Sequence, residues 1–205
     1  MTTPNIVTIG HSIHPIERFM ELLKQQGVTA VADVRSTPFS RDQPQFNKDA
    51  LQRSLKDAGI AYIFLGKELG ARSTDASCYE NGRVRYDRLA RTEVFRSGIA
   101  RVRKGAKEHR VALMCAEKEP LECHRTLLVA RALDREGEPV AHIHADGSLE
   151  AHEATMNRLF DLTGVPREDV FRSESELLEE ACRRQEEKVA YVDEELASQS
   201  GETQR

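Results

Sequence analysis

The sequence predicts an α/β protein of three layers, in which a largely parallel sheet is covered by helices on both faces. Five short runs rich in β-branched residues have the length of strands, and they lie at residues 6–9, 28–34, 60–65, 111–115 and 140–143. Most of these runs lack strict alternation of apolar and polar side chains, which is typical of strands covered on both faces. Helical patterns lie between most of the runs, and this alternation favours a parallel sheet.

Residues that start helices mark the segments between the runs. Residues 15–26 begin with Pro15, a residue favoured in the first turn of a helix. Asn47 is a predicted N-cap for the second helix, and Thr92 is a predicted N-cap for the third. We expect a fourth helix to follow Pro120 and to run to about residue 136.

The segment after the fifth run is predicted to be helical and to end in an acidic tail. A turn at residues 146–148 leads into one helix, and a second helix follows a cap at Ser173 or Ser175. We therefore divide the chain into an α/β domain of residues 1–165 and an acidic helical tail of residues 166–205. The last eight residues, 198–205, are expected to be disordered.

The acidic helix carries a stripe of mostly apolar residues at alternating steps of four and three positions. The stripe consists of Leu178, Cys182, Gln185, Val189, Val192 and Leu196. One interpretation is an amphipathic helix that packs on its own domain, and the other is a homodimer through this helix. A coiled coil needs about three or four sustained heptads, and Gln185 interrupts this shorter stripe, which favours packing within the chain.

Length and composition restrict the class of protein. The chain has 205 residues, which suits one domain with an appendage. No apolar run approaches the ~20 residues that a membrane helix needs, and the N-terminal residues lack the pattern of a secretion signal. Four cysteines are too few for a disulfide scaffold. We expect a globular cytoplasmic protein with no membrane partner.

The formal net charge of −4 is unevenly distributed along the chain. Residues 168–205 hold 12 acidic and 5 basic side chains, whereas residues 72–110 hold 11 basic and 5 acidic ones. The basic segment indicates either a polyanionic partner or a solvated surface. Because the chain has no tryptophan and only 5% aromatic residues, a stacking platform for single-stranded nucleic acid is poorly supported.

Polar and ionisable residues follow the ends of the predicted strands. Ligands of open parallel sheets bind beyond the carboxyl ends of the strands, so these loops are the expected place for a functional site. The candidate residues in them are His11, Ser12, Asp33, Arg35, Ser36, Ser40, Arg41, Arg72, Cys115, Glu117, Cys123, His124 and Arg125.

Several motifs in these loops carry a family resemblance. They are TIGHS at residues 8–12, DVRSTPFSR at 33–41, PQFN at 44–47, GIAYIFLGKELGAR at 59–72, LMCAEKEPLECHR at 113–125 and HIHADGS at 142–148. With them, the sequence resembles the bacterial family labelled domain of unknown function 488 over about residues 6–160. The resemblance implies a three-layer α/β fold and a pocket at these loops, but it implies no reaction. The tail beyond about Pro166 lies outside it.

The sequence Cys123-His124-Arg125 is expected at or near a helix N-terminus. The free amide groups there favour an anion and can lower the pKa of a thiol, and the guanidinium of Arg125 suits a phosphate or carboxylate. Cys123 is therefore a candidate nucleophile. The alternative is that Cys123 packs as a small buried side chain and Arg125 pairs with Glu117 or Asp33.

Carboxylates supply the candidate acid–base groups. Glu117 and Cys115 share one face of an extended strand by their spacing of two, and Glu117 can serve as acid, base or nucleophile, or else only hold an arginine in place. Asp33 closes an apolar run and needs a partner there. That partner is either Arg35, in a buried pair, or a histidine that Asp33 orients, such as His11.

The sequence indicates no cofactor. His11, Cys115, Cys123 and His124 are residue types that bind zinc, but they include no C-x-x-C pair and no helical H-x-x-x-H pair, so we predict no metal. A phosphate-binding Walker loop and a G-x-G-x-x-G turn are both absent from the sequence. A thiol redox role for Cys115 and Cys123 is a minor alternative.

The leading hypothesis is an enzyme that binds a phosphate-bearing substrate, such as a nucleotide or a nucleic-acid fragment, and catalyses hydrolysis or group transfer. The candidate catalytic residues are Asp33, Cys115, Glu117, Cys123 and His11. The candidates for holding the substrate are Ser12, Arg35, Ser36, Ser40, Arg41, Arg72, His124 and Arg125. The alternative hypothesis is a non-catalytic module that binds nucleic acid or a phosphorylated ligand.

Overall fold

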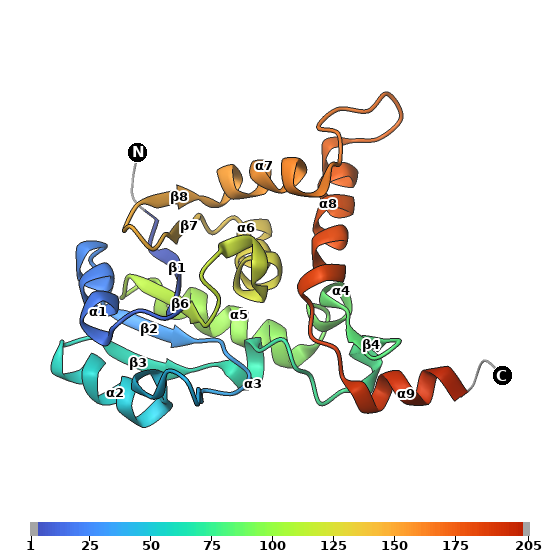
Figure 1. The fold of residues 1–205 in the computed structure, drawn as a ribbon. Coiled ribbons are helices and arrows are strands. Elements are labelled where there is room, and N and C mark those ends of the chain that lie inside the picture. Colours follow the sequence, from blue (N-terminus) through green and yellow to red (C-terminus); the bar gives the residue numbers. More distant parts are fainter. Residues whose placement is uncertain (1–3, 203–205) are drawn as a thin grey trace.

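A six-stranded, mostly parallel sheet forms the centre of the computed structural model, which describes residues 4–202 (Figure 1). Its strands, in spatial order, are β3 (Ala61–Phe64), β2 (Ala30–Asp33), β6 (Val111–Cys115), β1 (Ile6–Gly10), β7 (Val140–Ile143) and β8 (Leu149–Ala151). Only β8 runs antiparallel to its neighbour. The five predicted strands are therefore confirmed, and β8 is an addition at the edge.

Helices cover both faces of the sheet, which confirms the predicted three layers. On one face, α1 (Ile16–Gln25) and α2 (Lys48–Asp57) pack against alternate strand residues such as Val7 and Met114. On the other face, α5 (Glu93–Gly105) and the helices that follow β6 and β8 share a core with Leu113. The four inner strands β2, β6, β1 and β7 are buried on both sides, whereas the edge strands β3 and β8 are partly exposed.

The helix starts follow the predicted caps with one exception. The Thr92 hydroxyl accepts the amide hydrogen of Phe95 at 3.2 Å, and this bond caps α5. Asn47 also stands directly before its helix, α2, but its side-chain oxygen accepts the amide of Ser40 at 2.7 Å. The predicted capping bond of Asn47 is therefore wrong, since the side chain fastens the preceding loop instead.

The helix expected from Pro120 to about residue 136 is broken into pieces. Pro120 begins η3 (Pro120–Glu122), a single 3-10 turn that ends because Cys123 has extended backbone. A wide π-helical segment, η4 (Arg125–Ala130), follows and continues into α6 (Arg131–Arg135). The prediction of one helix was wrong, and the break places Cys123 before the helix rather than inside it.

The basic middle segment contains short elements that the sequence analysis did not predict. They are α3 (Gly66–Leu69), η2 (Ala76–Cys78), the antiparallel pair β4 (Tyr79–Glu80) and β5 (Arg83–Val84), and α4 (Tyr86–Leu89). Asn81 and Gly82 form the two-residue turn of the hairpin, with φ angles of 50° and 76°. Both angles lie in the left-handed region that a tight hairpin turn requires.

The C-terminal segment packs on the body of the same chain. After α7 (His152–Thr163), Ser173 and Glu176 form a capping box that starts α8 (Glu174–Val189). In Figure 1, α8 lies beside α4 and far from α1. Its residues Leu177 and Cys182 belong to the core on the face of the sheet that α5 covers. No helix among residues 4–202 is long and apolar enough to cross a membrane.

The stripe predicted for a homodimer is not continuous. The helix stops at Val189, and a second helix, α9 (Glu194–Glu202), starts after the turn that contains Val192. Gln185 donates to the carbonyl of Leu121 at 3.0 Å, so the polar position of the stripe serves an internal contact. Leu178, Val189 and Leu196 pack against the core of the same chain, which favours the first interpretation, an amphipathic helix on its own domain. The homodimer stays a prediction. Residues 198–202, expected to be disordered, belong to α9, and 203–205 lie outside the described residues.

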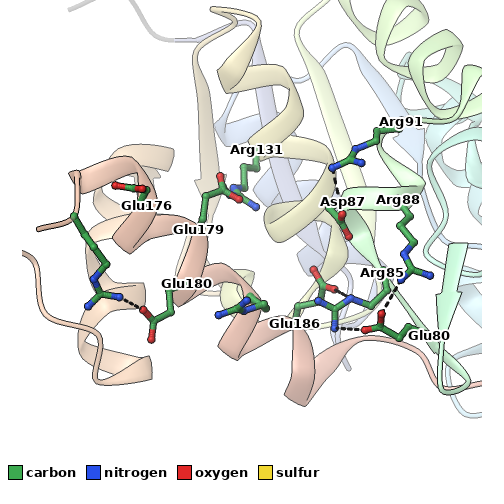
Figure 2. Close-up of a pocket in the computed structure, with 12 residues that line it drawn as sticks. Glu80, Arg85, Asp87, Arg88, Arg91, Arg131, Glu176, Glu179, Glu180 and Glu186 are labelled. Carbon is green, nitrogen blue, oxygen red and sulfur yellow. Dashed lines mark hydrogen bonds and ion pairs between the residues drawn. The ribbon is translucent and has the colours of Figure 1, made fainter.

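The basic segment and the acidic tail pair with each other. Among the described residues of that segment, six of the eleven basic side chains form ion pairs with carboxylates: Arg83, Arg85, Arg88, Arg91, Arg101 and Arg103. A depression of about 590 Å³ beside α8 is lined by such alternating charges. In Figure 2, Glu80 and Glu186 both turn toward Arg85. Two of these arginines, Arg83 and Arg85, pair with carboxylates of the acidic tail, so contacts between the two segments neutralise part of the uneven charge of the sequence.

Candidate active site

A cavity of about 480 Å³ lies at the carboxyl ends of β1, β2 and β6. Nine of the thirteen predicted site residues line it, namely His11, Arg35, Ser36, Ser40, Arg72, Cys115, Glu117, Cys123 and His124. The cavity is found where open parallel sheets bind their ligands. Of the other four, Ser12, Asp33 and Arg125 lie behind its wall or beside it, and Arg41 points outward in a solvent-exposed pair with Asp42.

Two thiols, an imidazole and a carboxylate form a cluster on the wall of the cavity. Nδ1 of His124 lies 3.7 Å from Sγ of Cys115 and 3.8 Å from Sγ of Cys123. Sγ of Cys123 lies 2.9 Å from Oε2 of Glu117. Both cysteines are buried, whereas Glu117 is an exposed residue whose carboxylate contacts Cys123.

The peptide chain around the cluster fixes these positions. Cys115 is the last residue of β6, and Cys123 is the extended residue that precedes η4. The amide of Arg125 donates to Sγ of Cys123 at 3.4 Å, as expected for a thiol at the start of a helix. The ring of His124 is held by a 3.0 Å hydrogen bond from Nε2 to the carbonyl of Val34.

The cluster shares its protons unevenly. Removal from water raises the pKa of the Cys115 thiol and of the Glu117 carboxyl. Burial also acts to raise the pKa of Cys123, but the hydrogen bond from Cys115 and the positive charges of Arg125 and His124 outweigh it, so the Cys123 pKa falls. In the 2.9 Å contact the thiol of Cys123 donates to Oε2 of Glu117, and the opposite shifts of their two pKa values allow one proton to be exchanged between the two groups.

Asp33 and Arg35 form the buried pair that was one of the two interpretations. Oδ2 of Asp33 accepts from Nη2 of Arg35 at 2.6 Å, and Oδ1 accepts from Nε at 2.9 Å. The hydroxyl of Tyr62 donates to the same carboxylate at 3.0 Å. Asp33 has no exposed surface and does not line the cavity. Its place in the structure is that of a support for Arg35.

His11 lies beside this pair as a neutral ring. Nδ1 of His11 donates to the carbonyl of Ser12 at 2.9 Å, and Nε2 accepts from Nη1 of Arg35 at 3.3 Å. The ring stacks on Phe46 with 4.3 Å between centroids. The pKa of His11 is lowered to about 4, mainly because the ring is buried. The charge of Arg35 also acts to lower this pKa, whereas the hydrogen bond to Ser12 acts to raise it. Asp33 does not contact the ring, because Arg35 stands between them.

Arg125 is fully buried and holds the loop after β6. Its guanidinium donates to the carbonyls of Glu117 at 2.6 Å and Lys118 at 3.2 Å, and Nε donates to Thr8. One donor of Arg125 is used on a side-chain hydroxyl and two on backbone carbonyls, and Arg125 does not line the cavity. Among the described residues its recorded partners include neither the carboxylate of Glu117 nor that of Asp33, and its predicted role as a direct anion ligand stays a prediction.

The serines of the second loop are also engaged with the backbone. The hydroxyl of Ser36 accepts the amide of Arg72 at 3.0 Å, and that of Ser40 accepts the amide of Gln43 at 3.0 Å. These contacts are the ordinary use of serine in turns. Both residues still line the cavity. Ser12 donates its amide to the carbonyl of Ala116 at 2.8 Å and supports the loop that carries Glu117.

The tail supplies cavity residues that the sequence analysis missed. Val189, the last residue of α8, and Tyr191, between α8 and α9, line the cavity. The guanidinium of Arg72 lies 4.5 Å from the centroid of the Tyr191 ring. The carbonyl of Tyr191 accepts the amide of Val84, which ties the tail to the hairpin. Tyr86 of α4 also lines the wall. These positions are distant in sequence from the loops after the predicted strands, where the candidate residues lie.

The fold and the cavity together define an α/β protein with a cysteine- and carboxylate-lined pocket at the carboxyl edge of its sheet. The family described as Domain of unknown function DUF488 matches residues 15–132, more than half of the chain. The chain belongs to this family, which confirms the predicted resemblance. A comparison with curated proteins finds no match, and a comparison with solved structures finds none either.

Proposed function

We propose that the chain is an enzyme that binds a phosphate-bearing substrate in the 480 Å³ cavity and catalyses its hydrolysis or the transfer of a group. The observation that carries this proposal is the 2.9 Å contact between Glu117 and Cys123 on a cavity wall that arginines face. A carboxyl group whose pKa is raised beside a thiol has the character of a general acid or base. Four free cysteines suit the reducing cytoplasm in which we place the protein.

Arg72 is the side chain best placed to receive an anion. It is exposed at the mouth of the cavity, and no carboxylate within residues 4–202 forms an ion pair with it. Its neighbour Tyr191 offers an aromatic face, which suits a substrate that joins a phosphate to a base or another flat ring. Arg35 adds positive charge in the wall, partly balanced by Asp33. An enclosed cavity of this kind fits a nucleotide-sized ligand.

Ion pairing in the basic segment favours a small substrate over a long polyanion. An extended nucleic acid needs a row of unpaired cations along its backbone. Arg85 and Arg88 pair with carboxylates of the tail and the hairpin, and Arg101 pairs with Glu68. The non-catalytic nucleic-acid module is for this reason the weaker alternative.

The proposal is tested with AMP, a dinucleoside monophosphate and ribose 5-phosphate as probes. We expect release of phosphate, base or nucleoside from at least one of them, measured by chromatography, and a turnover at least about 100-fold lower in Glu117→Gln. Binding without release would establish the non-catalytic module instead. Neither binding nor release of any probe at millimolar concentration would exclude this substrate class.

Arg72→Ala should weaken binding of AMP by about 10-fold, because a charged hydrogen bond to phosphate is lost. Titration calorimetry measures the change. Arg96→Ala is the matched control, since Arg96 is an exposed arginine of α5 that does not line the cavity. Equal affinities of the two variants would show that the anion binds elsewhere.

A further inference from the structure

Three residues of the cluster have the composition and spacing of a zinc site. Among the described residues, the ligand atoms of Cys115, Cys123 and His124 all lie within 4.8 Å of one another. The sequence predicted no metal because it contains neither a C-x-x-C pair nor a helical H-x-x-x-H pair among these residues. The fold supplies the proximity instead, since the loop after β6 returns and places Cys123 and His124 beside the end of that strand.

The distances within the cluster agree with tetrahedral zinc. Zinc binds sulfur at about 2.3 Å and imidazole nitrogen at about 2.0–2.1 Å, so sulfur and nitrogen ligands are roughly 3.6 Å apart in a tetrahedron. Nδ1 of His124 lies 3.7 Å from Sγ of Cys115 and 3.8 Å from Sγ of Cys123. The three ligand atoms all lie within 4.8 Å of one another, so their spacing is close to that of three ligands around one zinc ion.

The surroundings orient the ligands as in metal sites. Nε2 of His124 donates its hydrogen to the carbonyl of Val34 at 3.0 Å, which leaves the lone pair of Nδ1 directed at the two sulfurs. The amide of Arg125 donates to Sγ of Cys123 at 3.4 Å, a bond that stabilises a thiolate. The buried positive charge of Arg125 offsets part of the negative charge of two thiolates. These contacts fix two of the three ligands independently of any metal.

We propose that Cys115, Cys123 and His124 bind one zinc ion, with a fourth position that opens to the cavity beside Glu117. Thiolate and imidazole together favour zinc over magnesium or calcium, which prefer oxygen. Three protein ligands with one open position characterise catalytic rather than structural zinc. Glu117 lies where it can accept a proton from a water in that position. This role in catalysis rests on the proposed function, whereas binding of the metal does not.

The metal site makes the two thiols ligands rather than nucleophiles. It changes the interpretation of Cys123, whose thiolate would be neutralised by zinc and not free to attack a substrate. Glu117 then remains the acid–base group, in contact with Cys123 at 2.9 Å. Hydrolysis with water as the attacking group becomes the favoured reaction of the proposed function.

The test is metal analysis of the reduced, full-length protein. The protein is incubated with a slight excess of ZnCl₂ in the presence of a phosphine reductant, and unbound metal is removed by gel filtration. Metal analysis of the eluted protein should then give about one zinc per chain. Substitution by Co²⁺ should give visible bands of the intensity of tetrahedral coordination together with thiolate charge-transfer bands. Both measurements use the unmodified chain, so they do not depend on how any variant folds.

Zinc affinity should fall by more than about 100-fold in each of the variants Cys115→Ser, Cys123→Ser and His124→Ala. Loss of a residue that only hydrogen-bonds a metal ligand already lowers metal affinity by about 10–100-fold, and loss of the ligand itself should cost more. Cys78→Ser and Cys182→Ser are matched controls, because both cysteines are free and buried away from the cluster. If the chain binds zinc but does not turn over any of the probes, the zinc site is supported and the proposed enzymatic function is rejected.

The zinc proposal is overturned by a reduced chain that retains no zinc and shows no cobalt spectrum. It is equally overturned if the control variants lose zinc to the same extent as the three ligand variants. Turnover of a phosphate-bearing probe by a zinc-free chain, unaffected by a chelator, would keep the proposed function and reject the metal.

Discussion

Asp33→Asn is expected to lower the free energy of unfolding by about 3–5 kcal/mol, because it leaves the charge of Arg35 buried without its partner. The carboxylate of Asp33 has no exposed surface, and Arg35 is only 6% exposed. Three contacts of Arg35 and the hydroxyl of Tyr62 converge on the two oxygens of Asp33. A neutral amide preserves the shape of the side chain but not the charge that these donors require.

Urea unfolding of the wild-type chain and of Asp33→Asn measures this difference. The control is Glu179→Gln on α8, which breaks the pairs of Glu179 with Arg131 and Arg135 of α6. Glu179 is 51% exposed, and such pairs are worth at most about 1 kcal/mol. Equal losses of stability in the two variants would refute the structural role of Asp33. A stable Asp33→Asn that had lost turnover would instead return Asp33 to the candidate catalytic residues.

The strands of this fold were predictable because burial on both faces produces continuous apolar runs. The runs at residues 6–9 and 111–115 are such cases, and the structure places them side by side. The edge strand β8 was not predictable in this way, since Leu149 and Ala151 are exposed and only three residues pair. The hairpin turn at Asn81 and Gly82 did carry a signal, because Asn-Gly is the preferred pair for this type of turn.

The position of the site was predictable from the ends of the strands, but the roles of its residues were not. Sequence spacing cannot show that Arg125 is buried behind the cavity and bonded to the carbonyl of Glu117. It also cannot show that His124 faces Cys115, which is nine residues earlier and on another element. Tyr191 reaches the cavity from the tail through contacts with the hairpin, an arrangement that only the folded chain contains.

The charge pattern of the sequence had a structural reason. Opposite charges in two distant segments suggested separate functions, such as a polyanion site and an independent tail. Arg85 pairs with Glu186 (Figure 2) and also with Glu187, and these contacts show that the two segments pack against each other. Net charge along a sequence therefore says little about surface charge when the two segments pack together.

Acid should destabilise the chain through two buried histidines. Nε2 of His142 lies 3.0 Å from Nδ1 of His152, and Nδ1 of His142 lies 2.8 Å from the hydroxyl of Thr8. His142 has no exposed surface and His152 is 3% exposed. Burial lowers the pKa of His152 to about 4, with Asp134 opposing and Arg131 adding to the shift.

The pKa of His142 is lowered too, first by burial, then by His152, and further by the charges of Arg125, His144 and Arg158. The folded chain therefore keeps both rings neutral, while the unfolded chain protonates them below about pH 6.5. Since the unfolded state binds more protons, the free energy of unfolding falls as the pH decreases from about 6.5 to about 4. His152 alone accounts for about 3 kcal/mol of this fall at 1.36 kcal/mol per unit.

Urea unfolding at several pH values between about 4 and 7 measures this fall in the free energy of unfolding. The range includes the pKa of free histidine, about 6.5. The variant His152→Gln should show a smaller slope of unfolding free energy against pH, whatever its stability at neutral pH. The control is His109→Gln, since His109 is exposed and bonded only to Thr29 among the described residues. If His152→Gln and the wild-type chain have the same slope, the acid sensitivity comes from carboxylates elsewhere, and the His142–His152 pair is not its source.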